Sequence, residues 1–316
     1  MEYEKLGTSA LKVSTIGMGC VTFGREIDPS TSFDVLDRAF EGGINLLDTA
    51  AAYGNDRISE KLLGEWFINR GNRDSLILAS KMNGDMSAAA VNTSIEKSLH
   101  CLQTDRIDLF QLHHWPNKGW GKKHTEHPVE ETLEALDDQV RRGTVRYIGI
   151  SNTTGSQLQM ALELQRERRW EPFVSIQPQF NLVNHRDVEK DIFPVCRRES
   201  LGVLGYSPIG AGFLTGKYGR DRIIPPGTRF EVVPGHDEPY FHDHGFAVLD
   251  DLRNLSELSN RSMIDLALAW VFAQNDVTTV LIGARNTHQV DQAFKALENP
   301  LSKSEEEALD RAGTSM

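Results

Sequence analysis

The chain has 316 residues, 39% of them hydrophobic and 25% charged, and this composition excludes a disordered chain. Its 34 Lys and Arg against 45 Asp and Glu give a net charge of −11, which argues against a nucleic-acid-binding protein because such proteins carry a basic face. Three cysteines without a CxxC pair exclude a disulfide framework, and no stretch is apolar enough for a signal peptide or long enough to span a membrane, so we expect a cytoplasmic protein.

Short apolar runs recur along the chain and predict eight strands, which are short enough to be buried on both faces of a parallel sheet. They lie near residues 13–19, 44–48, 76–81, 107–113, 145–150, 173–177, 203–206 and 280–283. Amphipathic stretches between these runs predict helices. The helices lie near residues 32–41, 59–69, 89–102, 128–142, 157–168, 188–199, 263–273 and 287–297.

Eight repeats of strand and helix favour a closed (β/α)8 TIM barrel, expected as a single domain over residues 1–316. An open doubly wound sheet is the alternative. It would need a glycine-rich phosphate-binding turn after its first strand. Residues 17–24 match GxGxxG only loosely, with Thr22 in place of the third glycine and no helix directly after it, so the barrel is favoured.

Two segments depart from the repeat. Residues 1–12 predict a short β-hairpin with its turn around Gly7, which would plug one end of the barrel. Residues 216–244, after the seventh strand, form a long stretch rich in Gly, Pro and His. A loop of this length is either a functional lid or a disordered excursion, and the sequence leaves both open.

Polar residues close several of the apolar runs. Because the carboxyl ends of barrel strands meet at one face, where active sites of such barrels lie, these side chains should be neighbours. They are Asp48, Lys81, His113, Ser151, Asn152, Gln177 and Tyr206.

Three of these side chains, together with the nearby Tyr53, suggest a chemistry. A buried Lys81 needs a carboxylate partner, which Asp48 can supply. An ammonium beside Tyr53 would lower the pKa of the phenol from about 10 and make it a tunable acid. A neutral His113 could orient a substrate oxygen by a hydrogen bond. This set suits reduction of a carbonyl group, in which carbon receives a hydride and oxygen receives the phenol proton.

Other residues allow further interpretations. Phe23, Trp115 and Trp120 could line a substrate pocket, although Phe23 could equally pack in the core. Histidines at 113–114, 124–127 and 242–244 lack the spacing of a zinc site, so we expect no metal. A Schiff-base aldolase using Lys81 is disfavoured because Asp48 would keep the amine charged.

Several spaced motifs together resemble the aldo-keto reductase family, specifically its bacterial and plant branch. The resemblance covers residues 6–297, nearly the whole chain. It is carried by Leu47-Asp-Thr-Ala-Ala-Ala-Tyr-Gly54, Ser80-Lys81, Asp108-Leu-Phe-Gln-Leu-His113, Gly149-Ile-Ser-Asn152, Tyr206-Ser-Pro-Ile-Gly210 and Ile282-Gly-Ala-Arg285.

The resemblance implies NADPH as cofactor, with NADH as the alternative, and a small carbonyl compound as substrate. It makes Tyr53 the general acid, Asp48 and Lys81 its tuning pair, and His113 rather than His114 the substrate-orienting residue. It also implies a set of cofactor-binding residues: Ser151, Asn152 and Gln177 at the carboxamide, Tyr206 at the nicotinamide ring, Ser207, Ile209, Gly210 and Leu214 at the pyrophosphate, Arg285 at the 2′-phosphate, Gln289 at the adenosine end, and Gly283.

The sequence departs from the family pattern at one place, and the family also allows a second function. Gln292-Ala293 stands where the family often has Glu-Asn, so the Asn contact to the adenine is lost. Some barrels of this family bind the cofactor but act mainly as regulatory subunits of membrane channels. A complete set of Asp48, Tyr53, Lys81 and His113 favours the enzyme.

Overall fold

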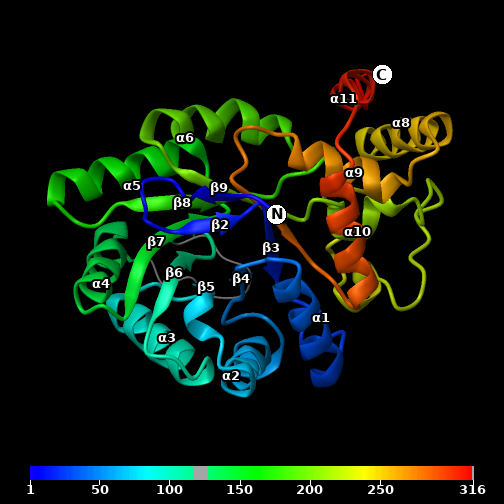
Figure 1. Cartoon of the computed structure of the whole chain (residues 1–316). Helices are drawn as coiled ribbons and strands as arrows, with labels where there is room; N and C mark the ends of the chain where they lie inside the picture. Colours follow the sequence, from blue (N-terminus) through cyan, green and yellow to red (C-terminus); the bar gives the residue numbers. More distant parts are fainter. Residues whose placement is uncertain (117–126, 315–316) are drawn as a thin grey trace.

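The strands of the chain close into a parallel barrel, as predicted. The structure, a computed structural model, describes residues 1–116 and 127–314. Within these residues the barrel order is β10-β3-β4-β5-β6-β7-β8-β9 (Figure 1). The strands are β3 (Ile16–Gly19), β4 (Leu46–Asp48), β5 (Ile77–Met82), β6 (Ile107–Leu112), β7 (Val145–Ser151), β8 (Phe173–Gln177), β9 (Gly202–Tyr206) and β10 (Thr279–Ile282).

Helices α1 to α6 surround the strands in Figure 1, and α8 to α11 complete the outer layer. Their apolar faces bury residues such as Leu36 and Ile95, which explains why the strands are apolar on both faces. No helix in residues 1–116 or 127–314 is long and apolar enough to cross a membrane. The helices are α1 (Pro29–Glu41), α2 (Ile58–Arg70), α3 (Ala88–Cys101), α4 (Val129–Arg141), α5 (Gly155–Arg168), α6 (Phe193–Glu199), α7 (Arg229–Val232), α8 (Asp243–Ser259), α9 (Met263–Phe272), α10 (Thr287–Glu298) and α11 (Lys303–Asp310).

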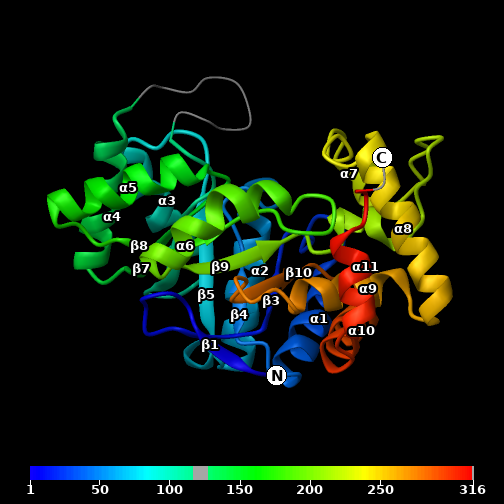
Figure 2. The ribbon, with the colours of Figure 1, turned by 90° about the horizontal axis from the view of Figure 1, so that it is seen from above.

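An N-terminal hairpin of β1 (Tyr3–Lys5) and β2 (Lys12–Ser14) closes one end of the barrel, as expected (Figure 2). Leu6 and Leu11 in its turn are buried against apolar residues that point into the barrel. Gly7 makes this approach possible, because a Cβ there would lie 2.2 Å from the Val174 carbonyl oxygen. The single strand predicted over residues 13–19 is therefore wrong in one detail: its first residues belong to the hairpin.

The 216–244 segment is packed, so its interpretation as a disordered excursion is wrong. The rings of Tyr218 and Phe230 stack with centroids 4.8 Å apart, and Tyr240 is 1% exposed. The segment contains α7, and α8 begins before its end. Helices α8 and α11 were not predicted at all. Trp270 of α9 donates a hydrogen bond to Asp310 of α11 at 2.8 Å and ties α11 to the barrel.

Two layers of side chains fill the barrel interior. Near the hairpin the layer is apolar, and it includes Leu46 and Leu109. Two residues further along the same strands lie Asp48 and Gln111, which are also buried. Since side chains two apart on a strand share a face, β4 and β6 each contribute to both layers. We call them the apolar layer and the polar layer.

Candidate active site

The polar layer lies at the carboxyl ends of the strands, the end of a (β/α)8 barrel where chemistry is found. Its centre is Lys81 of β5, which is fully buried. The ammonium of Lys81 donates hydrogen bonds to Asp48 Oδ2 at 2.6 Å, to the Thr49 carbonyl at 2.9 Å and to the Tyr53 hydroxyl at 3.2 Å. An ammonium has three donors, so these bonds fix its position completely.

Burial and charge act in opposite directions on this cluster. Burial raises the pKa of Tyr53 above its ordinary value, the Lys81 ammonium opposes this, and Asp48 adds to the rise. The prediction of a lowered Tyr53 pKa is therefore not supported, since desolvation outweighs the ammonium. For Lys81, burial disfavours the charge, but Asp48 and Tyr53 outweigh it and raise the pKa of the amine. The structure thus favours a protonated phenol beside a charged lysine.

Two adjacent histidines follow β6, and they have different surroundings. The ring of His113 meets the ring of Tyr53 edge to face, with centroids 5.9 Å apart. His114 instead accepts a hydrogen bond from the Gly84 N–H at 3.3 Å and lies 2.9 Å from the Trp115 carbonyl oxygen. Burial, followed by the charge of Lys81, lowers the pKa of His113 well below its usual value. His113 is therefore a neutral imidazole next to the phenol.

Gln111 belongs to the same cluster, although sequence reasoning missed it. Its side-chain amide donates to Asp48 Oδ1 at 3.3 Å, and the amide of Gln177 donates to the same oxygen at 2.8 Å. A signal was present, because Gln111 lies two residues before His113 on one strand and so shares its face. Both oxygens of Asp48 are thereby hydrogen-bonded, as a buried carboxylate requires.

Four of the predicted cofactor-binding residues form one network beside His113, three of them through their side chains. The amide of Asn152 donates to the His113 carbonyl at 2.9 Å and to Ser151 Oγ at 3.0 Å, and its oxygen accepts from the Tyr206 hydroxyl at 2.8 Å. Ser151 Oγ donates to the Gln177 carbonyl at 2.7 Å. These bonds hold the half-buried ring of Tyr206 at the end of β9.

The remaining predicted cofactor residues lie in two turns. After β9, Ser207, Ile209 and Gly210 form a turn in which Ser207 and Gly210 have positive φ, and the side chain of Leu214 is fully buried. After β10, Gly283 is exposed. Arg285 precedes the N-terminus of α10, where its backbone N–H donates to the side chain of Gln289 at 2.8 Å. A helix N-terminus beside an arginine favours an anion.

The 216–244 segment is tied to both sides of this end of the barrel. Arg229 of α7 donates to Glu26, in the loop after β3, at 2.5 Å. Arg285 donates to the Gly227 carbonyl at 2.8 Å. The exposed Lys217 lies close enough to Arg285 for the two charges to repel, and partial desolvation followed by this repulsion lowers the pKa of Lys217. The segment therefore adds positively charged side chains next to the turn that carries Arg285.

The structure describes two of the three residues proposed for a substrate pocket. Phe23 is fully buried in the main hydrophobic core, which is the alternative that the sequence left open for it. Trp115 is half-buried and packs against the same core. Trp120 lies outside the described residues, as does His124. His242 accepts a hydrogen bond from the N–H of Gly245 and caps α8, so it has a structural role.

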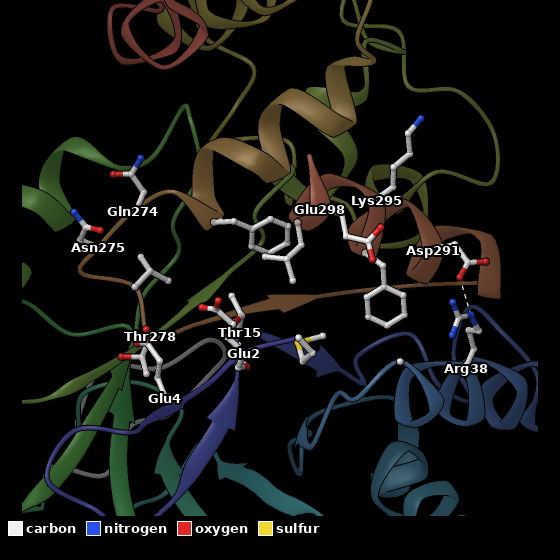
Figure 3. Close-up of a pocket in the computed structure, with 16 residues that line it drawn as sticks. Glu2, Glu4, Thr15, Arg38, Gln274, Asn275, Thr278, Asp291, Lys295 and Glu298 are labelled. Carbon is white, nitrogen blue, oxygen red and sulfur yellow. Dashed lines mark hydrogen bonds and ion pairs between the residues drawn. The ribbon is translucent and has the colours of Figure 1, made fainter. Parts of the chain in front are cut away.

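A hollow of about 760 Å³ lies at the opposite end of the barrel from these residues (Figure 3). It is lined by Glu2 and Glu4 of the hairpin and by residues of α1 and α10. Arg38 and Asp291 point toward one another across it, at 2.7 Å. Since it faces the amino ends of β3 and β10, it is separate from the polar layer.

Comparison with known proteins agrees with the geometry. The chain matches the model of the aldo/keto reductase family over residues 15–313. It is 33% identical to the uncharacterized oxidoreductase YrpG of Bacillus subtilis, over 96% of this chain and 93% of that protein. It is 31% identical to the aldo-keto reductase YhdN of the same bacterium, over 92% and 87%, and 28% identical to a probable voltage-gated potassium channel subunit beta of Oryza sativa, over 94% and 92%. With its barrel and these relatives, the chain belongs to the aldo/keto reductase family of oxidoreductases.

Proposed function

We propose that this protein reduces an aldehyde or ketone, sugar carbonyls among them, to the alcohol in a reversible, NADPH-dependent reaction with Tyr53 as the proton donor. One observation carries the proposal: the fully buried Lys81 donates at once to Asp48 and to Tyr53. A buried ion pair is a poor source of stability, so its presence at the mouth of the barrel favours a chemical role.

The three groups around a substrate oxygen have separate tasks. Tyr53 stays protonated at neutral pH, because its pKa is raised, and it gives its proton to the oxygen. The charged Lys81 then stabilises the phenolate that remains, since its hydrogen bond to that oxygen becomes charge-assisted on both sides. The neutral imidazole of His113 lies beside the Tyr53 ring and can donate a hydrogen bond to the same substrate oxygen. In the reverse direction the phenolate accepts the proton.

The residues present fit a nicotinamide dinucleotide. When bound, a reduced nicotinamide supplies the hydride. Ser151, Asn152 and Gln177 offer hydroxyl and amide groups to a carboxamide, and the half-buried Tyr206 ring offers a flat apolar face. At the other end, Arg285 and Lys217 offer positive charge beside the N-terminus of α10. A guanidinium there suits the 2′-phosphate of NADPH, which NADH lacks.

Tyr53→Phe tests the proposal. Purified protein and variant are assayed for NADPH consumption with a panel of aldehydes, ketones and sugars. The variant keeps the ring but loses the proton donor, so turnover should fall about 10²–10⁴-fold while NADPH binding is unchanged. Equal turnover by the two proteins would remove Tyr53 from the mechanism. Absence of turnover with tight NADPH binding would favour the alternative below.

The alternative is a nicotinamide-binding regulatory subunit with little turnover. It is favoured by one observation, the 28% identity to a probable potassium channel subunit beta over most of both chains. The same barrel would then bind the cofactor without releasing product at a useful rate. Steady turnover over many cycles with any substrate of the panel excludes it.

A further inference from the structure

A second ion pair, between a partly buried arginine and a fully buried carboxylate, lies behind the polar layer, on the outer side of the barrel wall. Arg57 ends the segment that carries Tyr53, and its guanidinium donates to Glu60 Oε2 at 2.8 Å. The same guanidinium donates to Ser98 Oγ at 2.8 Å and to Ser94 Oγ at 3.1 Å. Both serines belong to α3, one helical turn apart on the same face. Arg57 therefore fastens the end of the Tyr53 segment to a neighbouring helix.

Glu60 connects this anchor to the strand of the catalytic lysine. Its side chain is fully buried, and Oε1 accepts a hydrogen bond from Ser80 Oγ at 2.6 Å. Ser80 precedes Lys81 on β5, and successive side chains of a strand point to opposite faces. The Ser80 side chain thus faces outward to Glu60 while Lys81 faces inward to Tyr53. One carboxylate holds both the segment that carries the phenol and the strand that carries the ammonium.

The backbone between Tyr53 and Arg57 needs such an anchor. Gly54 has φ +73°, and Asp56 and Arg57 have φ +51° and +57°. Glycine adopts this left-handed region freely, but side chains such as those of Asp56 and Arg57 disfavour it. A residue is held in that region only when its surroundings over-determine the conformation. The three hydrogen bonds of the Arg57 guanidinium provide that constraint.

The neighbouring residue of α2 adds further hydrogen bonds to the segment that carries Tyr53. Ser59, next to Glu60, donates to the Cys20 carbonyl at 2.8 Å and shares a hydrogen bond of 2.9 Å with Thr49 Oγ1. The carbonyl of Thr49 is one of the three acceptors of the Lys81 ammonium. The first turn of α2 therefore contacts both ends of the segment between Asp48 and Arg57.

We propose that Arg57 and Glu60 are positioning residues: the ion pair fixes the Tyr53 segment against β5 and so sets the 3.2 Å separation between the Tyr53 hydroxyl and Lys81 Nζ. The proposal rests on the proposed function in one respect, that Tyr53 exchanges a proton with the substrate. Neither residue contacts substrate or cofactor in this arrangement. Their effect passes through the position of the phenol.

Arg57→Gly is the primary variant. Glycine accepts the left-handed backbone, so the substitution removes the guanidinium without adding strain. Loss of about 1 Å of positioning costs up to about 10²-fold in rate, so kcat for carbonyl reduction should fall between about tenfold and 100-fold. NADPH affinity, measured by fluorescence titration, should not change, because the proposed cofactor residues lie on β7 to β10 and their loops.

The chain offers a matched control in Arg73→Ala. Arg73 donates to the buried Asp108 at 2.7 Å, and Asp108 also accepts from the Leu78 N–H at 3.0 Å, at the other end of β5. This variant likewise removes a guanidinium from a buried carboxylate attached to β5, but far from Tyr53. It should lower the melting temperature at least as much as Arg57→Gly does, with kcat unchanged.

The pH profile of alcohol oxidation distinguishes a displaced Tyr53 from a less stable fold, because lost stability alone would not shift it in this way. The Lys81 ammonium lowers the pKa of Tyr53 against the effect of burial. If the phenol moves away from the ammonium, that pKa rises further. Alcohol oxidation needs the phenolate, so its onset should move to higher pH in Arg57→Gly and in Glu60→Ala. The shift should be smaller in Glu60→Gln, which can still accept from Ser80 but no longer pairs with the Arg57 guanidinium.

The outcomes separate this inference from the proposed function. Unchanged kcat and an unchanged pH profile in Arg57→Gly, with Tyr53→Phe inactive, would overturn the positioning role and leave the proposed function standing. An equal loss of kcat in Arg73→Ala would also overturn it, because the effect would then be general loss of stability. Full activity of Tyr53→Phe would remove the proposed function itself, whatever Arg57→Gly does.

Discussion

The apolar and polar layers inside the barrel come from the same strands but differ in what burial does to them. Leu46 and Leu109 lose only contact with water, and each buried leucine contributes about 1.5–3 kcal/mol to stability. Two residues further along, Asp48 and Lys81 lose the hydration of their charges. They are tolerated because each finds partners at hydrogen-bonding distance, including Gln111.

The difference suggests that the two layers have separate roles, one in stability and one in chemistry. The apolar layer, sealed by the hairpin, stabilises the barrel without offering any reactive group. The polar layer adds little stability, because its attraction is offset by desolvation, yet it holds a charged amine and a protonated phenol 3.2 Å apart. Substitutions in either layer should therefore lower stability, but only those in the polar layer should lower kcat.

The largest expected effect is that of Lys81→Met. Loss of the ammonium should reduce kcat about 10²–10⁴-fold, since the phenol loses the group that stabilises its anion. It should also destabilise the fold by about 3–5 kcal/mol, because Asp48 is left as an uncompensated buried charge. The double variant Asp48→Asn with Lys81→Met should recover most of that stability but no activity. Denaturant unfolding and NADPH assays on all four proteins of this cycle check both statements.

The next effect concerns the apolar layer. Leu109→Ala leaves a cavity under the hairpin and should cost about 2–5 kcal/mol of unfolding free energy. The folded fraction should keep the wild-type kcat, because the strand ends are two residues away and separately hydrogen-bonded. A drop in kcat measured well below the melting temperature would show that the two layers are not independent.

A smaller effect is expected at the phosphate end. Arg285→Gln removes a charge-assisted hydrogen bond, which is worth about 1.5–3 kcal/mol, so NADPH affinity should fall about 10- to 100-fold. NADH affinity should hardly change. If both cofactors lose affinity equally, Arg285 does not recognise the 2′-phosphate.

The smallest effect concerns pH and stability. Burial lowers the pKa of His113 in the folded state, so the unfolded chain binds a proton that the folded site refuses. Stability should therefore fall as pH drops below about 6.5, the ordinary value of histidine. His113→Gln should flatten this acid loss while leaving stability at pH 8 nearly unchanged. Urea titrations at pH 5 and pH 8 compare the two proteins, and equal slopes would contradict a buried neutral imidazole.

Much of the fold could be predicted from sequence because parallel strands buried on both faces read as short apolar runs. The missed helix α11 also had a signal, since Ser302 and Glu305 form a capping box at its start. Helix α8 begins after His242, an unusual residue for an N-cap, and its first residues lie within the 216–244 segment, so no start was visible. The split between β2 and β3 depends on which residues the hairpin buries, which no local pattern reveals.

The cluster of Asp48, Tyr53 and Lys81 could be predicted because topology brings strand ends together. The pKa values within this cluster could not be predicted from the sequence. Whether burial or the ammonium controls the pKa of Tyr53 depends on how much water reaches the phenol, which is a property of the folded site. The Arg57–Glu60 pair was missed for a related reason, because it lies on the outer face of the wall, where the sequence pattern is that of ordinary helix packing.

The closure of the barrel by β10 has a consequence for synthesis. Val280 pairs with Ile16, and Thr279 pairs with Leu204, so the last strand joins the first strand of the barrel to the seventh. Until β10 leaves the ribosome, β3 and β9 each present an unpaired edge. Exposed strand edges template association with other chains, so a nascent chain stalled before Thr279 would be a client for chaperones.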